Sequence, residues 1–262
     1  MATVKPPAVA GMFYPSDPAT LAAEIDAFLA RAEPAEGPPP KALIAPHAGY
    51  VYSGPVAASA YARLIPAADR IRRVVILAPS HRVPFRGIAT SSADWFRTPL
   101  GDVPVDRKAV EAALALPQVS TFDAAFAEEH ALEVHLPFLQ RVLPEFSIVP
   151  FVVGEADPAE VSELLDLLWD GDETLIVVSS DLSHYLDYHS ARERDARTTA
   201  AIEALRPDLI GFHDACGRIP VNGLLLAAKE HGLQPQTVDL RNSGDTAGDK
   251  SRVVGYGAYV FR

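Results

Sequence analysis

The chain has 262 residues, of which 48% are hydrophobic, and its mean hydropathy is +0.08. It can therefore bury a large core, and we expect one domain over residues 1–262. No apolar run approaches the ~20 residues that span a bilayer, the first residues lack the apolar segment of a signal peptide, and a single cysteine excludes an internal disulfide framework. We therefore expect a soluble, cytoplasmic protein without a membrane partner, and a net charge of −11 without a Lys/Arg cluster argues against nucleic acid.

Helix and strand signals alternate along the first half of the chain. Asp17 as N-cap and Pro18 at the first helical position predict a helix with Leu21 and Ile25 on its apolar face. After a proline-rich connector, the predicted elements are a buried strand at 41–45, a helix at 55–65, a buried strand at 74–78 and one or two hairpin-like strands within 87–105.

The second half continues the alternation. We predict helices at 106–115 and 124–143, a strand at 146–154, a helix at 158–170, a strand at 175–178, helices at 189–205 and 221–231, and a final strand, glycine-rich turn and strand. This order predicts an α/β layered fold with a central, mostly parallel or mixed sheet flanked by helices.

Polar side chains follow three of the predicted buried strands. His47, His81 and the pair Asp181 and His184 each lie just past the carboxyl end of such a strand. Ligands of open α/β sheets bind outside these ends. If the three strands are parallel neighbours, the four side chains converge on one edge of the sheet.

This set of residues predicts a metal site. Two imidazoles and one carboxylate form the facial triad of non-haem iron enzymes, which leaves open positions for a substrate. His47 and His81 would supply the nitrogens, and Asp181 or Asp245 the carboxylate, with His184 as an acid/base. In a simpler interpretation Asp181 is a turn or cap residue, His184 a solvent-facing loop residue and Asp245 part of a tight turn.

Two further features allow more than one interpretation. The segment "EEHALEVH" places Glu129, His130 and His135 in a predicted helix, where the histidines lie about 140° apart and cannot easily share one ligand. One of them could position a substrate or a ligand, or the helix could simply face solvent. Cys216 is most simply a small buried hydrophobe, and a nucleophile paired with His184 or His47 is the alternative.

Several segments, in order, resemble the Memo family, whose prokaryotic members are called AmmeMemoRadiSam system protein B. They are "PAVAGMFYPSDPATL", "APHAGYVYSGPVAA", "LAPSH", "EEHALEVHLPFL", "SSDLSHY", "CGRIPVNGLL" and "NSGDTAGDKSRVVGYGAY". The resemblance implies a fold like that of class III extradiol ring-cleavage dioxygenases, which are non-haem iron(II) enzymes.

The resemblance also implies roles for particular residues. His47 and His81 correspond to metal ligands, and His184, beside Asp181, to the acid/base region. In eukaryotic Memo the third ligand is a cysteine of the C-terminal turn, where this sequence has Asp245 or Gly244. Asp245 is therefore the preferred third ligand, and Asp181 the second choice.

Three functions follow as hypotheses. The first is a dioxygenase-like, metal-dependent oxidoreductase of unknown substrate that uses Fe(II), with Zn or Cu as alternatives. The second is a non-catalytic binding protein for a peptide or small anion, and the third is a zinc-dependent hydrolase. The family's name also implies a functional association with a radical SAM protein.

Overall fold

A computed structural model describes residues 2–34 and 37–262, so residues 35 and 36 of the proline-rich connector lie outside the described residues. Within the described ranges, nine strands form the main sheet. In spatial order they are β10 (His184–Leu186), β12 (Val253–Phe261), β2 (Ala42–Ala45), β9 (Thr174–Ser179), β3 (Arg73–Pro79), β8 (Ser147–Val153), β4 (Ile88–Thr90) and β7 (Val119–Thr121), with β11 (Pro235–Asn242) paired to β12.

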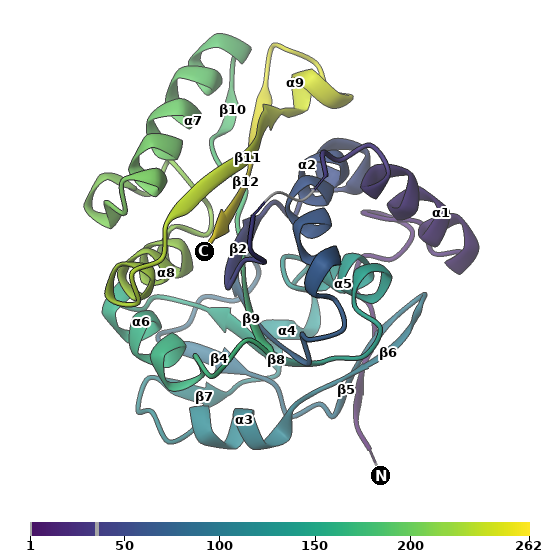
Figure 1. The fold of residues 1–262 in the computed structure, drawn as a ribbon, viewed down its shortest axis with the longest axis vertical. Coiled ribbons are helices and arrows are strands. Elements are labelled where there is room, and N and C mark those ends of the chain that lie inside the picture. Colours follow the sequence, from purple (N-terminus) through teal and green to yellow (C-terminus); the bar gives the residue numbers. More distant parts are fainter. Residues whose placement is uncertain (1, 35–36) are drawn as a thin grey trace.

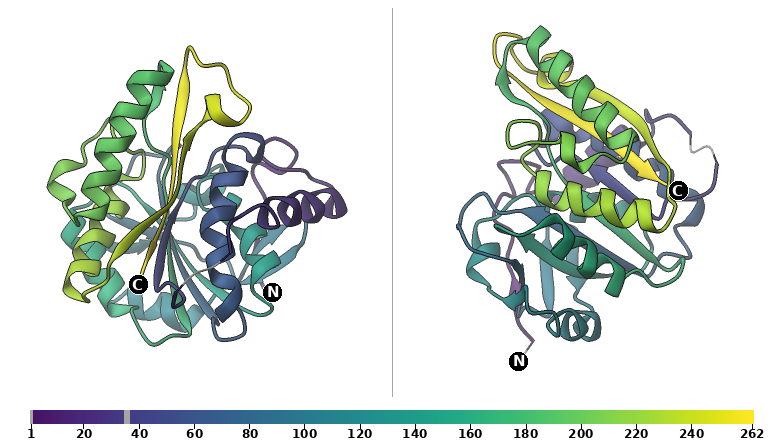
Figure 2. Two further views of the ribbon diagram at one scale, coloured as in Figure 1. Left: turned by 45° about the horizontal axis from the view of Figure 1, so that its top comes forward. Right: turned by 90° about the vertical axis from the view of Figure 1, so that its left-hand side faces the viewer.

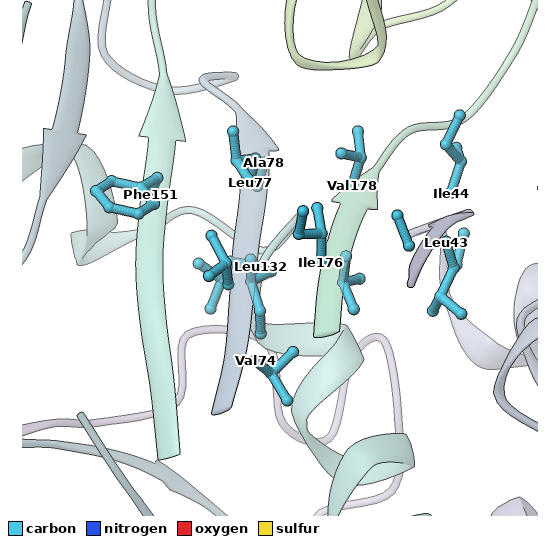
Figure 3. Packing of buried hydrophobic residues seen from close by; sticks show 14 of the residues in the cluster. Leu43, Ile44, Val74, Leu77, Ala78, Leu132, Phe151, Ile176 and Val178 are labelled. Carbon is cyan, nitrogen blue, oxygen red and sulfur yellow. The ribbon is translucent and has the colours of Figure 1, made fainter. Parts of the chain in front are cut away.

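The centre of the sheet consists of four parallel strands, β2, β9, β3 and β8. Their sequences are nearly continuous apolar runs rich in valine and isoleucine, as expected of strands that are covered on both faces. Figure 3 shows their side chains in this lateral order, from Phe151 on β8 to Leu43 on β2. Outside this centre, β12 runs antiparallel to β2 and β4 runs antiparallel to β8, so the sheet is mixed, in agreement with the predicted fold class.

Helices cover both faces of the sheet (Figures 1 and 2). On one face α2 (Tyr50–Tyr61) packs on β2 and β12, and α1 (Pro18–Leu29) and α5 (Leu136–Val142) pack beside it. On the other face α8 (Arg218–Glu230) packs on β9 and β3, next to α6 (Pro158–Leu167), and α7 (Tyr188–Glu203) lies over β11 and β12. The remaining helical segments are η1 (Ala62–Ala67), α3 (Arg107–Ala113), α4 (Ala124–Ala127), η2 (Glu133–His135), η3 (Pro207–Leu209) and α9 (Ser243–Thr246).

The expected start of the first helix is confirmed, because the Asp17 side chain accepts a hydrogen bond from the backbone N–H of Thr20 at 2.8 Å. The hairpin expected within 87–105 is also present. It is formed by β5 (Trp95–Thr98) and β6 (Gly101–Pro104), which pair antiparallel and form a small second sheet with β1 (Val4–Lys5).

The helix predicted over 124–143 was wrong as a single element. It is broken after α4, and helical structure resumes only at η2 and α5. The reason is the buried carboxylate of Glu129, which accepts hydrogen bonds from the backbone N–H groups of His130 and Ala131, both at 3.0 Å. A side chain that takes up local backbone donors competes with the helical hydrogen bonds.

No helix within residues 2–34 and 37–262 is long and apolar enough to cross a membrane.

Candidate metal centre

The strand order brings the predicted histidines together. His47 follows β2 and His81 follows β3, and β9 lies between these two strands and runs parallel to both. The carboxyl ends of all three therefore meet at one edge of the sheet, and the ring centroids of His47 and His81 are 5.1 Å apart. His47 and His81 therefore lie side by side at this edge.

A cysteine completes the group. Among the described residues, His47, His81 and Cys216 offer ligand atoms that all lie within 4.8 Å of one another. The Cys216 Sγ is 3.3 Å from the His47 Nε2, and it also accepts a hydrogen bond from the backbone N–H of Asp181 at 3.3 Å. Two imidazoles and one thiol thus converge from three segments that are far apart in the sequence.

The loop that carries Cys216 reaches the sheet edge because of a glycine. Gly217 lies directly against the end of β9, where an added Cβ would be 2.5 Å from the Ser179 carbonyl oxygen and 2.7 Å from the Ser180 Cβ. The backbone N–H of Gly217 donates to the Ser180 hydroxyl at 3.0 Å. Only glycine allows this close approach, which sets the position of the neighbouring thiol.

Ser179 determines which nitrogen of His47 is free. Its hydroxyl donates its one hydrogen to the Ala131 carbonyl at 2.6 Å. The His47 Nδ1 at 2.7 Å and the His135 Nε2 at 2.8 Å must then both donate to the Ser179 Oγ. The lone pair of His47 is therefore on Nε2, which faces Cys216.

The charges of these imidazoles agree with this assignment. Burial, together with the neighbouring His81 and His130, holds the pKa of His47 well below its usual value. Burial and His130 lower the pKa of His135 to about 3. Both rings are neutral near pH 7, and the Nδ1 of His135 accepts a hydrogen bond from the Tyr61 hydroxyl at 2.8 Å.

Glu129 orients the second imidazole. Its carboxylate accepts from the His81 Nδ1 at 2.9 Å and from the His81 backbone N–H at 2.6 Å. Burial raises the pKa of Glu129, but the hydrogen bonds from His81 and the backbone outweigh it, so that the pKa is lowered and the group is ionised. A carboxylate that holds the Nδ1–H of a histidine and frees its Nε2 is the usual support of a metal ligand.

A cavity of about 860 Å³ adjoins the group. His81 and Cys216 form part of its wall, and so does His184, whose Nδ1 donates to the Leu182 carbonyl at 2.8 Å. The His184 Nε2 has no hydrogen-bond partner among the described residues. The volume suits a small molecule. A ligand in the cavity would thus lie next to two of the three donor side chains.

Comparison with known proteins agrees with the sequence resemblance. The profile of the family described as "Memo-like protein" matches residues 5–260. The chain belongs to the Memo family. A MEMO1 family protein of Aquifex aeolicus is 38% identical, with 98% of this chain and 99% of the relative covered, and one of Methanopyrus kandleri is 36% identical, with 98% of each covered.

The fold also resembles that of a solved structure, an uncharacterised protein of Escherichia coli K12. The TM-score is 0.53 at 13% identity, with 84% of this chain and 98% of the other covered. This similarity concerns the fold alone.

Asp245, which the resemblance suggested as third ligand, lies apart from the converging donors of this Memo chain. Asp245 is exposed in α9, where its carboxylate accepts from the Tyr188 hydroxyl at 2.5 Å and from the Asn242 backbone N–H at 3.0 Å. It caps a short helix and belongs to neither group of converging donors among the described residues. Cys216, and not Asp245, lies beside His47 and His81.

Asp181 supports the site of the Memo chain without joining the donors. It is buried, and its carboxylate accepts from the His47 backbone N–H at 2.8 Å. Its backbone pairs with that of Cys216, so that it links the two loops. Burial raises its pKa, and the closest approach of its carboxylate to the His47 Nε2 is 3.9 Å.

His130 and His135 contact different parts of the site in this Memo chain, His130 beside His81 and His135 beside Ser179. The His130 ring stacks on His81 with 4.9 Å between centroids, and with Glu129 these residues form the second group of converging donors within the described ranges. The Glu129 carboxylate already accepts hydrogen bonds from His81 and from backbone N–H groups, so its role in that group is to orient the His81 ring. His135 is fully engaged by Ser179 and Tyr61 behind His47.

Sequence reasoning gave Ser179 no role in this Memo chain and did not place Cys216 beside both His47 and His81. Each has a local signal, since Ser179 ends a buried strand and Cys216 precedes a helix with a glycine at its start. Neither signal says which strand end the Cys216 loop approaches.

Proposed function

We propose that this Memo-family protein holds a metal ion through His47, His81 and Cys216 and is an oxidoreductase acting on a small molecule in the adjoining cavity. One observation carries the proposal. The three donors lie within 4.8 Å of one another, and Ser179 and Glu129 leave the Nε2 atoms of both imidazoles free. A histidine that served only the core would have no need of a lone pair that faces a thiol, as the His47 Nε2 does.

The donor set fits a transition metal. Two imidazoles and a thiolate suit iron, copper or zinc and not magnesium or calcium, which prefer oxygen. Burial and the neighbouring Asp181 raise the pKa of the Cys216 thiol, so metal uptake would release its proton. Iron(II) is our first choice because, like copper and unlike zinc, it supplies redox chemistry when bound.

The chain's own residues would do the remaining work. Glu129 and Ser179 fix the orientations of the two imidazoles, and Asp181 holds the His47 and Cys216 loops together. His184 lies in the cavity wall with its Nδ1–H fixed on a carbonyl. Its Nε2 can therefore take a proton from, or return one to, a molecule in the cavity.

The test is elemental analysis of protein purified without oxygen and supplied with iron(II), zinc or copper(I). The variants are His47→Ala and Cys216→Ser, with Asp245→Ala as the matched control. We expect near-stoichiometric iron in the native protein and in Asp245→Ala, and loss of at least nine tenths of it in the other two.

Other results would change the assignment. Iron lost in Asp245→Ala and kept in Cys216→Ser would restore the carboxylate triad. Zinc retained together with oxygen-independent cleavage of an ester or amide would make the protein a hydrolase. A native protein that takes up none of the three metals would contradict the proposal and favour a binding protein.

A further inference from the structure

The walls of the cavity carry positive charge, although the protein as a whole carries a net charge of −11. Arg82 lies in the loop after β3, Arg194 on α7 and Arg218 at the start of α8, and all three contribute to the lining. Glu155 is the one carboxylate residue of the lining among the described residues. A cleft lined by one sign of charge concentrates ligands of the opposite sign.

Two of these guanidinium groups are not neutralised. Within residues 2–34 and 37–262, no carboxylate lies within ion-pair distance of Arg82 or Arg218, and the Arg218 guanidinium lies over the Phe212 ring, 5.7 Å from its centroid. Arg194 is partly compensated, because its Nη1 is 3.6 Å from the Asp214 carboxylate. Unpaired guanidinium groups are the usual partners of carboxylate and phosphate oxygens.

The first turn of α8 contributes independently. This helix has 13 residues, and its N-cap, Gly217, provides no side-chain hydrogen bond within the described structure. Cys216, Arg218 and Ile219 around this turn line the cavity. The uncapped end of a helix carries a partial positive charge and favours an anion.

Apolar side chains form a large part of the remaining wall. Phe85, Leu182 and Ile219 line it, and the exposed rings of Tyr185 and Phe212 complete it. Apolar walls with a few charged groups bury the body of an organic molecule and fix the direction of its polar end.

We infer that this cavity binds a small organic oxyanion, with its carboxylate or phosphate group held by Arg82, Arg194 and Arg218 and its apolar body against the aromatic wall. The inference deepens the proposed function and rests on it in one respect, since the bound molecule would then lie beside His81 and Cys216. Carboxylate and phosphate esters share the chemistry that guanidinium groups recognise, and the test separates them.

The experiment is isothermal titration of the metal-loaded protein with benzoate, phenyl phosphate and the neutral analogue benzamide. The variants are Arg82→Gln and Arg218→Gln. The control is Arg70→Gln, an exposed arginine that precedes β3, at the opposite end of the strands from the cavity. Metal content is measured on the same samples.

We expect benzoate or phenyl phosphate to bind at least ten times more tightly than benzamide, and the tighter of the two identifies the anion. Each cavity variant should weaken that binding at least tenfold while keeping its metal, and Arg70→Gln should bind like the native protein. Equal binding of benzamide and the anions, or native affinity in both cavity variants, would overturn the inference. Loss of metal along with the anion would also overturn it, since the arginines would then act through the metal site. A protein that holds no metal but still discriminates the anions would support this inference and contradict only the proposed function.

Discussion

Ser179 shows how one side chain at the end of a strand can fix two buried imidazoles. Its hydroxyl donates to the Ala131 carbonyl and accepts from His47 and His135, so all of its hydrogen-bonding capacity is used within the core. Buried donors left without an acceptor are costly, and the network therefore specifies both tautomers. The hydrogen bonds of this one residue thus fix the orientation of both imidazoles.

Ser179→Ala tests that account. The change leaves two buried imidazole N–H groups without acceptors, and we expect the free energy of unfolding to fall by about 2–4 kcal/mol. Metal affinity should fall roughly 10–100-fold because the His47 ring loses its support. The measurements are urea unfolding and metal competition titrations.

Ser162→Ala is the matched control, since its buried hydroxyl has no hydrogen-bond partner within the described residues. We expect this variant to be neutral or slightly more stable. Native metal affinity in Ser179→Ala would show that the hydroxyl does not orient His47.

At the scale of elements, the site depends on how closely a helix start approaches a strand end. The N-terminal end of α8 lies against the end of β9 through Gly217, and this contact sets the position of Cys216. At the opposite end of the strands, Asp106 caps α3, accepting from the Ala109 backbone N–H at 3.0 Å, and pairs with Arg73 of β3 at 2.8 Å. The Gly217 contact positions the Cys216 thiol, whereas the Asp106 contacts stabilise the fold away from the cavity.

Gly217→Ala should displace the Cys216 loop. Its Cβ would meet backbone and Ser180 atoms that cannot move freely, so we expect a loss of about 1–3 kcal/mol of stability and at least a tenfold loss of metal affinity. Calorimetry and metal titration measure both.

Gly211→Ala in the same loop is the control, because the Cβ would approach only the Asp214 carboxylate, at 3.3 Å. Equal metal affinity in Gly217→Ala and Gly211→Ala would contradict the role given to the close approach.

Asp106→Asn predicts a dependence of stability on pH. Burial raises the pKa of Asp106, but hydrogen bonds from the Ala109 backbone and Arg73 outweigh it and lower the pKa below its usual value. The carboxylate therefore stabilises the fold above the unfolded-state pKa of about 3.9, and this contribution is lost as pH falls through the lower folded-state pKa.

We expect Asp106→Asn to be less stable than the native protein by about 0.5–1 kcal/mol at pH 7 and the difference to shrink on acidification below about pH 4. Urea unfolding at a series of pH values measures it. Asp69→Asn, which changes an exposed carboxylate without a hydrogen-bond or ion-pair partner among the described residues, should show no such trend. A difference that grows on acidification would contradict the assignment.

At the scale of the whole molecule, the three donors tie together parts of the chain that are distant in sequence. His47, His81 and Cys216 belong to three separate connections at one edge of the sheet. A ligand that binds the folded state alone stabilises the entire structure, because the unfolded chain cannot bring these donors together.

Metal removal should therefore lower the melting temperature. At a free metal concentration of 100 times Kd the stabilisation is about 2.7 kcal/mol, which corresponds to roughly 5–10 °C in a protein of this size. Differential scanning calorimetry before and after chelation measures the shift, which should vanish in Cys216→Ser and persist in Asp245→Ala. An equal shift in both variants would place the metal elsewhere.

The sequence by itself determined the parts of the structure that local patterns encode. Continuous apolar runs predicted β2, β3 and β9, Asp17 and Pro18 marked the start of α1, and His47 and His81 could be placed at strand ends, because burial and capping act over a few residues. Only the tertiary structure decided that β9 lies between β2 and β3, that Glu129 breaks a predicted helix to hold His81, and that Cys216 rather than Asp245 faces His47. These decisions depend on contacts between segments more than 30 residues apart, and the spacing of residue types along the chain carries no information about which loop approaches which strand end.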